Sequence, residues 1–285
     1  MPSPGSGSAG PGRESSSAKL FCGVDLGASA AKLVLLDEEH TVRATVVKPS
    51  GVDYAATARA CLAEALESLG ADDLRPARTV STGYGRRNVE YADASATEIH
   101  CHGIGCYHHL GHAMTIVDIG GQDNKIIRLG ADGKRVGFRM NRKCAAGTGA
   151  FIEEIALRLG LPLDQMEGLA REAPTAVKLS SFCTVFAKTE ILSHLRDGVP
   201  VSAIVRGAFR SVVVRVMEMD PLDGNVVLSG GVVAHNPTIA DILEAELGRP
   251  VEIAPDPQLT GALGAALVAA GNQATTHLPS DRVTR

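Results

Sequence analysis

The sequence predicts an α/β protein in which two lobes enclose a cleft. One short motif occurs twice, in residues 20–37 and again in residues 115–129, and each copy reads D-[L/I]-G-x4-K inside an apolar hairpin. A third apolar strand, within residues 225–237, ends in a Gly-Gly turn. The chain of 285 residues also exceeds the length at which one hydrophobic core usually divides. One unit of two lobes is therefore the expected arrangement.

The overall composition limits the possible classes of function. Hydrophobic residues make up 45% of the chain and charged residues 21%, which is ordinary for a globular enzyme. The net charge of −4 gives no reason to expect nucleic acid or an anionic membrane as a partner. The chain also lacks a run of about eighteen apolar residues that could form a membrane span.

The two ends of the chain are expected to lie outside the folded part. Residues 1–19 are rich in Gly, Ser and Pro and lack the apolar centre of a secretion signal, so they predict a disordered tail and a cytoplasmic protein. Residues 272–285 are expected to form a second, flexible tail. In a reducing cytoplasm the six cysteines should be thiols, metal ligands or redox groups rather than structural disulfides.

Each copy of the repeated motif combines an acid, a glycine turn and a lysine. In both copies the lysine follows the acid by seven positions. Glycines let backbone N–H groups approach phosphate oxygens, and a carboxylate can organise Mg²⁺ through water. A single copy could be an ordinary Asp-Gly hairpin, but the matched pair favours a nucleotide site. The candidate residues are Asp25, Gly27, Ser29, Lys32, Asp118, Gly120, Gly121, Gln122, Asp123 and Asn124.

The third segment, NVVLSGGVVAHNP at residues 225–237, predicts a strand that continues through Ser229-Gly230-Gly231 into a helix. This geometry lets the backbone pack against an adenosine and places a helix N-terminus near phosphates. The alternative is an ordinary tight turn between strand and helix. Its position after the two hairpins favours Gly230 and Gly231 as nucleotide-binding residues.

In this order the three segments resemble the superfamily of acetate kinases, sugar kinases, heat-shock chaperones and actin. The resemblance implies two ribonuclease-H-like lobes with ATP between them, and a cleft whose closure depends on the nucleotide. Residues 20–114 would form the first lobe, completed by a C-terminal helix at about 260–271. Residues 115–259 would form the second lobe.

Two cysteines each precede a predicted amphipathic helix. Cys144 lies before a helix at residues 151–159, which Gly160 can end, and Cys183 lies directly before a helix that Gly198 can end. The free N–H groups of a helix N-terminus stabilise a thiolate, which suits a metal ligand. The alternative is two small buried residues at tight helix starts.

The cysteine segments carry a more specific resemblance. CAAGTG at residues 144–149 and CTVFA at 183–187, whose cysteines are 39 positions apart, resemble the ATP-dependent activators of 2-hydroxyacyl-CoA dehydratases and the ATP-binding subunits of benzoyl-CoA reductases. The runs STGYGR at 81–86 and LSGGV at 228–232 fit the same family. The resemblance covers about residues 20–270 and adds three nucleotide-binding candidates: Gly147, Thr148 and Gly149.

In that family each subunit supplies two cysteines to one [4Fe–4S] cluster at a dimer interface, so the resemblance implies Cys144 and Cys183 as ligands. A cubane normally needs four thiolates, and an identical or a homologous second subunit would complete the set. The implied cofactors are the cluster, ATP or ADP, and Mg²⁺. The implied partners are that second subunit, a CoA-thioester dehydratase or reductase component, and a ferredoxin or flavodoxin that donates electrons.

The resemblance also implies roles in ATP hydrolysis. Asp25 and Asp118 would organise Mg²⁺, Lys32 would neutralise phosphate charge, and Gln122 or Asp123 would position the attacking water.

The family commonly has Ser at the position of Ala28, so Ser29 or the backbone must compensate for that missing hydroxyl. Arg142 and Lys143, directly before Cys144, would make this side of the cluster more positive. The run NRKCAAGTGAF slightly favours the benzoyl-CoA reductase branch of the family over the dehydratase activators, but it does not identify the branch.

A small-molecule kinase with the same lobes is the main alternative function. It would need a carboxylate base near the γ-phosphate, for which Asp93 and Glu98 are the candidates. A nucleotide-gated filament or scaffold protein is the alternative outside enzymes. Neither alternative explains Cys144 and Cys183.

The other four cysteines fall in two groups. Residues 98–112, EIHCHGIGCYHHLGH, could suggest a zinc site, but their spacing matches no standard zinc finger and favours a surface helix. Cys22 lies in the first predicted strand and Cys61 in a predicted helix, so both are expected in the core.

Overall fold

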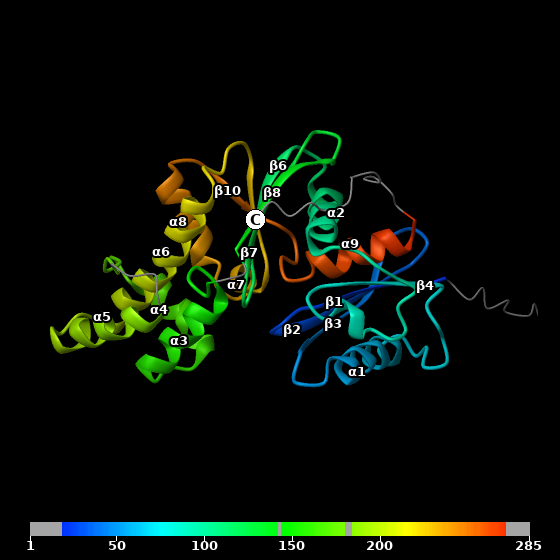
Figure 1. Cartoon of the computed structure of the whole chain (residues 1–285), viewed down its shortest axis with the longest axis horizontal. Coiled ribbons are helices and arrows are strands. Elements are labelled where there is room, and N and C mark those ends of the chain that lie inside the picture. The colour runs from blue at the N-terminus through cyan, green and yellow to red at the C-terminus, as the bar shows by residue number, and fades with distance from the viewer. Residues whose placement is uncertain (1–18, 142–143, 180–183, 272–285) are drawn as a thin grey trace, which may run out of the picture.

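The computed structural model describes residues 19–141, 144–179 and 184–271, which form two halves, each built on a five-stranded sheet (Figure 1). The predicted tails lie outside the described residues, apart from Lys19. Within the described segments, none of the helices is both long and apolar enough to cross a membrane.

The first sheet has the strand order β3-β2-β1-β4-β5. β1 pairs antiparallel with β2 and parallel with β4, so the strand–turn–strand predicted for residues 20–37 is confirmed. The strands are β1 (Phe21–Leu26), β2 (Ala30–Leu36), β3 (Val42–Pro49), β4 (Arg78–Thr82) and β5 (Ala94–Ser95).

The second sheet repeats the topology of the first. Its order is β10-β9-β6-β7-β8, which matches the first sheet strand for strand when read from its other edge. β6 pairs antiparallel with β7 and parallel with β9, as β1 does with β2 and β4. The strands are β6 (Met114–Ile119), β7 (Asn124–Leu129), β8 (Arg135–Asn141), β9 (Val226–Ser229) and β10 (Val251–Ile253). The repeated motif therefore belongs to a repeat of the whole sheet.

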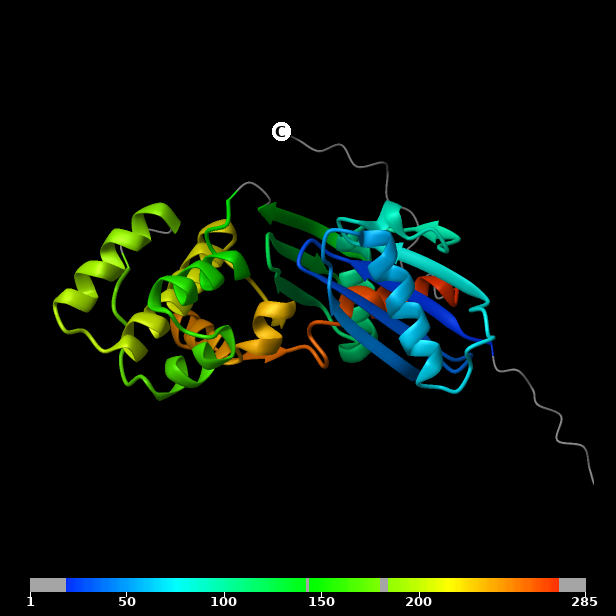
Figure 2. The same ribbon diagram turned by 90° about the horizontal axis from the view of Figure 1, so that it is seen from below.

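Most helices cover the sheet of their own half. α1 (Tyr54–Glu67) packs on β2 and β3, and Figure 2 shows it lying across one face of the first sheet. Most helices of the second half gather at the opposite end of the molecule, and α7 lies nearer its centre (Figure 1). The helices of this half are α3 (Gly149–Leu159), α4 (Met166–Glu172), α5 (Thr184–Arg196), α6 (Val201–Met219), α7 (Gly231–His235) and α8 (Thr238–Leu247). Short 3₁₀ turns at Arg86–Asn88 and Leu163–Gln165 complete the helical elements of the described segments.

The two helices expected near the cysteines are present. α3 ends at Gly160, which has the left-handed φ of 65° that a helix-ending glycine adopts. Its buried side chains, including Phe151, Ile152 and Ile155, belong to the core of the second half, as their helical spacing predicted. α5 ends at Arg196, shortly before Gly198.

Two further helices cross between the halves. α2 (Glu98–Leu110) follows the last strand of the first sheet but packs against β6, β7 and β8 of the second. α9 (Thr260–Ala269) follows the last strand of the second sheet but packs against β1, β2 and β4 of the first. The two helices also contact each other, side by side between the sheets (Figure 1). This exchange joins the halves into one unit.

Glycines allow this close contact between α2 and α9. A methyl group added to Gly105 of α2 would collide with the carbonyl oxygen of Thr260, and one added to Gly264 of α9 would collide with the carbonyl oxygen of Cys101. The backbones of the two helices therefore touch without intervening side chains.

The prediction that residues 98–112 form a surface helix is wrong for the first two turns of α2. Cys101, His102 and Cys106 are buried because the helix lies between the second sheet and α9. Within the described part of the chain, no three His, Cys, Asp or Glu side chains are arranged to hold a metal ion. Cys22 and Cys61 lie in the core of the first half, as predicted.

The contact between α2 and α9 predicts a large effect of one methyl group. Gly264→Ala should lower the free energy of unfolding by about 2–3 kcal/mol, because the added methyl collides with the Cys101 carbonyl group and must push the helices apart. A urea unfolding curve measures this loss. Gly168→Ala in α4 is the matched control, because that position has open space and Ala favours a helix over Gly. Equal stability of both variants would contradict the described packing.

Candidate active site

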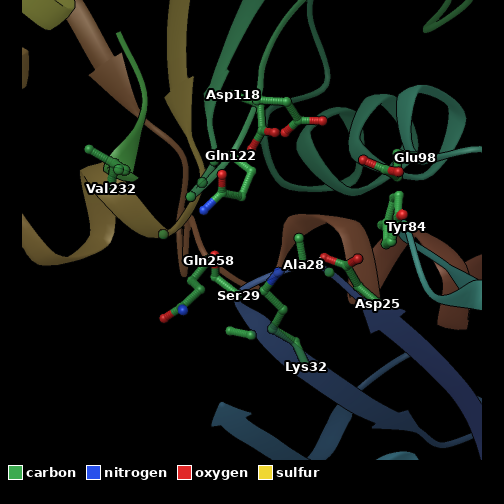
Figure 3. Close-up of a pocket in the computed structure, with 18 of the residues that line it drawn as sticks. Asp25, Ala28, Ser29, Lys32, Tyr84, Glu98, Asp118, Gln122, Val232 and Gln258 are labelled. Carbon is green, nitrogen blue, oxygen red and sulfur yellow. Dashed lines mark hydrogen bonds and ion pairs between the residues drawn. The ribbon is translucent and has the colours of Figure 1, made fainter. Parts of the chain in front are cut away.

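A cavity of about 1320 Å³ lies between the two sheets. It is bounded by the turns of the β1–β2 and β6–β7 hairpins, the start of α3, the β9–α7 turn and one side of α2. Figure 3 shows side chains from both halves facing one another: Asp25, Ser29 and Lys32 from the first and Asp118, Gln122 and Val232 from the second. The volume is sufficient for a nucleotide.

Most of the predicted nucleotide-site residues line this cavity: Asp25, Gly27, Ser29, Lys32, Asp118, Gly120, Gly121, Gln122, Asp123, Gly149, Gly230 and Gly231. Gly147 and Thr148 are not among its lining residues. The Thr148 hydroxyl donates to the carbonyl oxygen of Ala145 at 2.7 Å, and the Gly147 carbonyl oxygen accepts from Asn124 Nδ2 at 2.5 Å. Asn124, expected as a phosphate donor, is fully buried and holds this loop instead.

In each hairpin the acid and the lysine of the motif are direct cross-strand neighbours. Asp25 stands opposite Lys32 in the β1–β2 register, and Asp118 stands opposite Lys125 in the β6–β7 register. Lys32 Nζ lies 3.0 Å from Asp25 Oδ2, and Lys125 Nζ lies 3.1 Å from Asp118 Oδ2. Because a buried carboxylate is costly without a partner, this pairing explains the spacing that the two copies share.

Lys125 is enclosed by three carboxylates. Besides Asp118, its Nζ contacts Asp123 Oδ1 at 2.8 Å and Glu98 Oε2 at 3.1 Å. Burial alone would lower the pKa of Lys125, but the three carboxylates together raise it. Burial alone would likewise raise the pKa of Asp118, yet the neighbouring His102, Lys125 and Lys32 bring it down to about 2. The lysine and this acid are therefore both charged at neutral pH.

The acids in the inner part of the cavity outnumber the lysines. Asp25, Asp118, Asp123 and Glu98 face Lys32 and Lys125, and all of them line the cavity. Oxygen ligands with excess negative charge suit Mg²⁺, which favours carboxylates and retained waters. These acids suit contact with a nucleotide-bound Mg²⁺ ion through its retained waters, because no three described His, Cys, Asp or Glu side chains are arranged to hold the ion directly.

Gly83 and Gly230 occupy equivalent places beside the two acids. Both have a positive φ, 91° and 97°. A methyl group on Gly83 would lie 2.6 Å from Asp25 Oδ1, and one on Gly230 would lie 2.8 Å from Asp118 Oδ1. The STGYG run at 81–85 is thus the structural counterpart of the Gly-Gly turn after β9, an equivalence that the sequence spacing did not reveal.

The β6–β7 turn is bonded directly to the start of α3. The Gly149 N–H donates to the Gly120 carbonyl oxygen at 2.9 Å, and the Ala150 N–H donates to the Gly121 carbonyl oxygen at 2.8 Å. The expectation that the first N–H groups of this helix are free to stabilise the Cys144 thiolate is therefore wrong. These bonds instead connect the loop that follows Cys144 to a wall of the cavity.

Cys144 differs from four other cysteines in the described segments. It is exposed, whereas Cys22, Cys61, Cys101 and Cys106 are fully buried. Burial raises the pKa of the Cys22, Cys101 and Cys106 thiols to about 12, which disfavours the thiolate that a metal needs.

The second predicted ligand, Cys183, lies outside the described residues, and the next residue, Thr184, begins α5. α5 packs against α3, so the two cysteines precede neighbouring helices. An accessible thiol at Cys144 fits a cluster ligand.

Lys125 and His102 line the cavity but were not predicted as part of a nucleotide site, and Glu98 was predicted only as a candidate kinase base. Lys125 could have been added because it repeats Lys32 in the motif. Glu98 and His102 are four positions apart on α2 and so share one helix face, which is a weaker signal. Asp93, the other candidate for a kinase base, is not among the cavity residues; its Oδ2 accepts the Thr79 N–H at 2.7 Å.

Two related sheets with acidic hairpins around one cavity define an ATPase fold of the actin and sugar-kinase type. Residues 22–269 match the BadF/BadG/BcrA/BcrD ATPase family, and the chain belongs to this family. A glucokinase of the ROK family from Streptomyces griseus, solved with glucose and AMPPNP, shares the fold alone, with a TM-score of 0.53 and 14% identity over 88% of this chain and 99% of that one.

More similar proteins come from the family itself. The activator of lactoyl-CoA dehydratase from Anaerotignum propionicum is 42% identical over 87% of this chain and 96% of that protein. The solved activator of the 2-hydroxyisocaproyl-CoA dehydratase from Clostridium difficile, with bound ADPNP, has a TM-score of 0.83 and 35% identity over 89% of this chain and 95% of that one. A benzoyl-CoA reductase component from Thauera aromatica is 26% identical over 87% of this chain and 92% of that protein.

The enclosure of Lys125 predicts that this lysine stabilises the fold. Lys125→Met should lower the free energy of unfolding by about 3–5 kcal/mol, because buried carboxylates lose their cation. Chemical denaturation at neutral pH without nucleotide measures the loss.

Lys134→Met is the matched control, since the Lys134–Asp132 pair is exposed and its loss should leave stability unchanged within error. If Lys125→Met were as stable as this control, the three carboxylates could not be relying on Lys125.

Proposed function

We propose that this protein is an ATP-hydrolysing electron activator. It would pass low-potential electrons from a [4Fe–4S] cluster, shared by two chains, to a CoA-thioester dehydratase or benzoyl-CoA-type reductase. The observation that carries the ATP part is the pair of Asp–Lys hairpins facing one cavity. The names of the family relatives, which are activators of such dehydratases, support the remainder.

The nucleotide would span the cavity with its phosphates between the two hairpin turns. Asp25 and Asp118 would organise Mg²⁺, while Lys32 and the glycine turns contact phosphate. Gln122 faces the cavity (Figure 3), whereas Asp123 is bonded to Lys125, so Gln122 is the better placed of the two for the attacking water.

The nucleoside would lie towards α3 and α7. Ile152, Leu163 and Val232 supply apolar lining there, beside the Gly230-Gly231 turn. An apolar wall next to a glycine turn suits a flat base and the sugar that carries it.

The cluster would be held by Cys144 and Cys183 of each of two chains. A bound cluster supplies one-electron transfer at low potential. Support comes from the accessible Cys144 thiol and from exposed apolar side chains on the same two helices, Leu157 of α3 with Phe186 and Leu192 of α5. Exposed apolar groups of this kind are typical of a protein interface. A homodimer or a homologous heterodimer would satisfy the requirement for four thiolates.

A path of hydrogen bonds could link the nucleotide to the cysteines. The β6–β7 turn is bonded to the start of α3, and Asn124 at the beginning of β7 is bonded to Gly147 in the preceding loop. We infer that nucleotide-driven closure moves residues 115–259 against residues 20–114 and α9, and shifts α3 together with its neighbour α5. A ferredoxin or flavodoxin in the cytoplasm would supply the electrons.

The similarity values favour a dehydratase as the partner enzyme. Identity is 42% to the lactoyl-CoA dehydratase activator and 26% to the benzoyl-CoA reductase component. The NRKCAAGTGAF segment favours the benzoyl-CoA reductase branch instead. Identity over 250 residues is stronger evidence than a resemblance over these eleven.

Iron analysis of anaerobically purified protein tests the cluster assignment. The wild-type protein should be brown and contain about four irons per two chains. Cys144→Ala and Cys183→Ala should each abolish the iron content. Cys144→Ala should leave ADPNP affinity unchanged because Cys144 does not line the cavity, and the same is expected of Cys183→Ala because the proposal assigns Cys183 to the cluster and not to the nucleotide. Cys61→Ala, which alters a buried core thiol, is the control and should keep its iron.

Retention of iron in both ligand variants would refute the choice of these cysteines. A colourless wild-type protein that hydrolyses ATP after anaerobic reconstitution with iron and sulfide would refute the cluster while leaving the ATPase assignment intact.

A further inference from the structure

Arg86 carries a positive charge at the wall of the cavity. It follows the STGYG turn after β4 and lines the cavity together with Asp25 and Glu98. The two lysines there are already paired, Lys32 with Asp25 and Lys125 with three carboxylates. Arg86, in contrast, forms no ion pair with any residue that the structure describes. A guanidinium without a carboxylate partner at a cavity wall is a candidate binding group for an anion.

The backbone around Arg86 is fixed to the end of β1. The Gly85 N–H donates to the Leu26 carbonyl oxygen at 2.7 Å, and Leu26 directly follows Asp25 in the chain. The Ser81 hydroxyl donates to the Arg86 carbonyl oxygen at 2.9 Å. The loop is therefore held against the first acidic hairpin by its own hydrogen bonds.

The guanidinium group of Arg86 extends inwards and keeps most of its donors free. Nη1 donates to the Gly83 carbonyl oxygen at 3.1 Å, which is the only hydrogen bond of this group within the described segments. A guanidinium has five N–H donors, so four remain for a ligand. Arg86 is half-buried, whereas Arg87 is exposed. Burial raises the pKa of the Cys101 thiol on α2, and the charge of Arg86 is among the influences that lower it, which places this charge on the α2 side of the loop.

The equivalence of the two halves indicates which end of ATP faces Arg86. Gly83 lies beside Asp25 as Gly230 lies beside Asp118, so each half has one such turn. The proposed nucleoside position is next to Gly230, and the phosphates would lie between the two hairpin turns. The chain of phosphates then runs from the second half towards the first. Its γ end is therefore on the side of the STGYG turn, where Arg86 lies.

We propose that Arg86 contacts the γ-phosphoryl group of ATP and stabilises the charge that develops during hydrolysis. This inference rests on the proposed hydrolysis of ATP in this cavity. Arginines with this function occur in other phosphoryl-transfer enzymes, either in the same chain as the nucleotide site or in a partner. The planar fork of N–H groups can bind two phosphate oxygens at once. Arg86 is accordingly a catalytic residue of this site.

The reaction leaves the arginine unchanged. The oxygen of the attacking water forms a bond to the γ-phosphorus, while the bond from this phosphorus to the β–γ bridging oxygen breaks. ADP keeps the electron pair of the broken bond. One proton of the water stays on the phosphate product, and the other is released to solvent. Negative charge shifts during this exchange, and a guanidinium that is already held in place stabilises it without further reorganisation.

Arg86→Gln tests the contact by removing the charge while keeping a polar side chain. We expect kcat for ATP hydrolysis to fall about 100- to 1,000-fold, with an unchanged melting temperature and an ADPNP affinity within about tenfold of wild type. The affinity for ADP with aluminium fluoride, which mimics the phosphoryl group in the transition state, should fall much more than the affinity for ADPNP. The full chain is purified under anoxia, and binding is measured by calorimetric titration.

Two further variants separate charge from geometry. Arg86→Lys keeps the charge but loses the fork, so its kcat should lie between those of Arg86→Gln and wild type. Arg86→Ala leaves a space at the cavity wall, and free guanidinium ions in the assay should restore part of its activity. Arg59→Gln is the matched control, because Arg59 pairs with Glu90 on the surface outside the cavity and the variant should keep wild-type kcat.

Several outcomes would overturn the inference. Wild-type kcat in Arg86→Gln would do so while leaving the ATPase assignment intact. A loss of ADPNP affinity or melting temperature that accounts for the loss of kcat would show that Arg86 only holds the Gly83 turn. If Arg86→Gln does not fold, Arg86→Lys decides, because wild-type kcat in that variant would exclude a role for the fork. A wild-type protein that binds ADPNP but never hydrolyses ATP would contradict both the proposed ATPase activity and the role of Arg86.

Discussion

The burial of two carboxylates, Asp25 and Asp118, is the constraint on which the rest of the structure depends. Both are almost inaccessible to solvent, and a buried charge is costly unless an opposite charge and hydrogen bonds compensate for it. Each hairpin meets this requirement by placing a lysine directly opposite its acid. A register shift of one residue would send that lysine to the other face of the sheet. The spacing of seven positions is therefore a condition for burying the acid.

The exchange of α2 and α9 between the sheets brings further groups to these acids. α2 carries Glu98 to Lys125 and His102 to Asp118, while α9 brings Thr260 against His102. The site is consequently shared by both halves, and a movement of one half against the other changes its contacts. The bonds between the β6–β7 turn and α3 extend the same movement to the segment that follows Cys144. This arrangement would give the proposed nucleotide-dependent closure a physical route to the proposed cluster.

Local patterns in the sequence were sufficient for the hairpins, for the helices after Cys144 and Cys183, and for the buried Cys22 and Cys61. Each of these features depends on residues close together in the chain. The contacts that the sequence did not reveal join distant segments: His102 and Thr260 are 158 positions apart, and Asn124 binds a loop 23 positions away. Burial of α2 likewise follows from its position between α9 and the second sheet, which no pattern within the helix encodes.

The most direct test of this account is a crystal structure of the chain with Mg²⁺ and ADPNP. The account predicts that the phosphates lie between the β1–β2 and β6–β7 turns, with Asp25 and Asp118 on opposite sides of the metal ion and its waters. It would be contradicted by an analogue bound outside the cavity, or by one held through a single hairpin with the other acid still facing only its lysine.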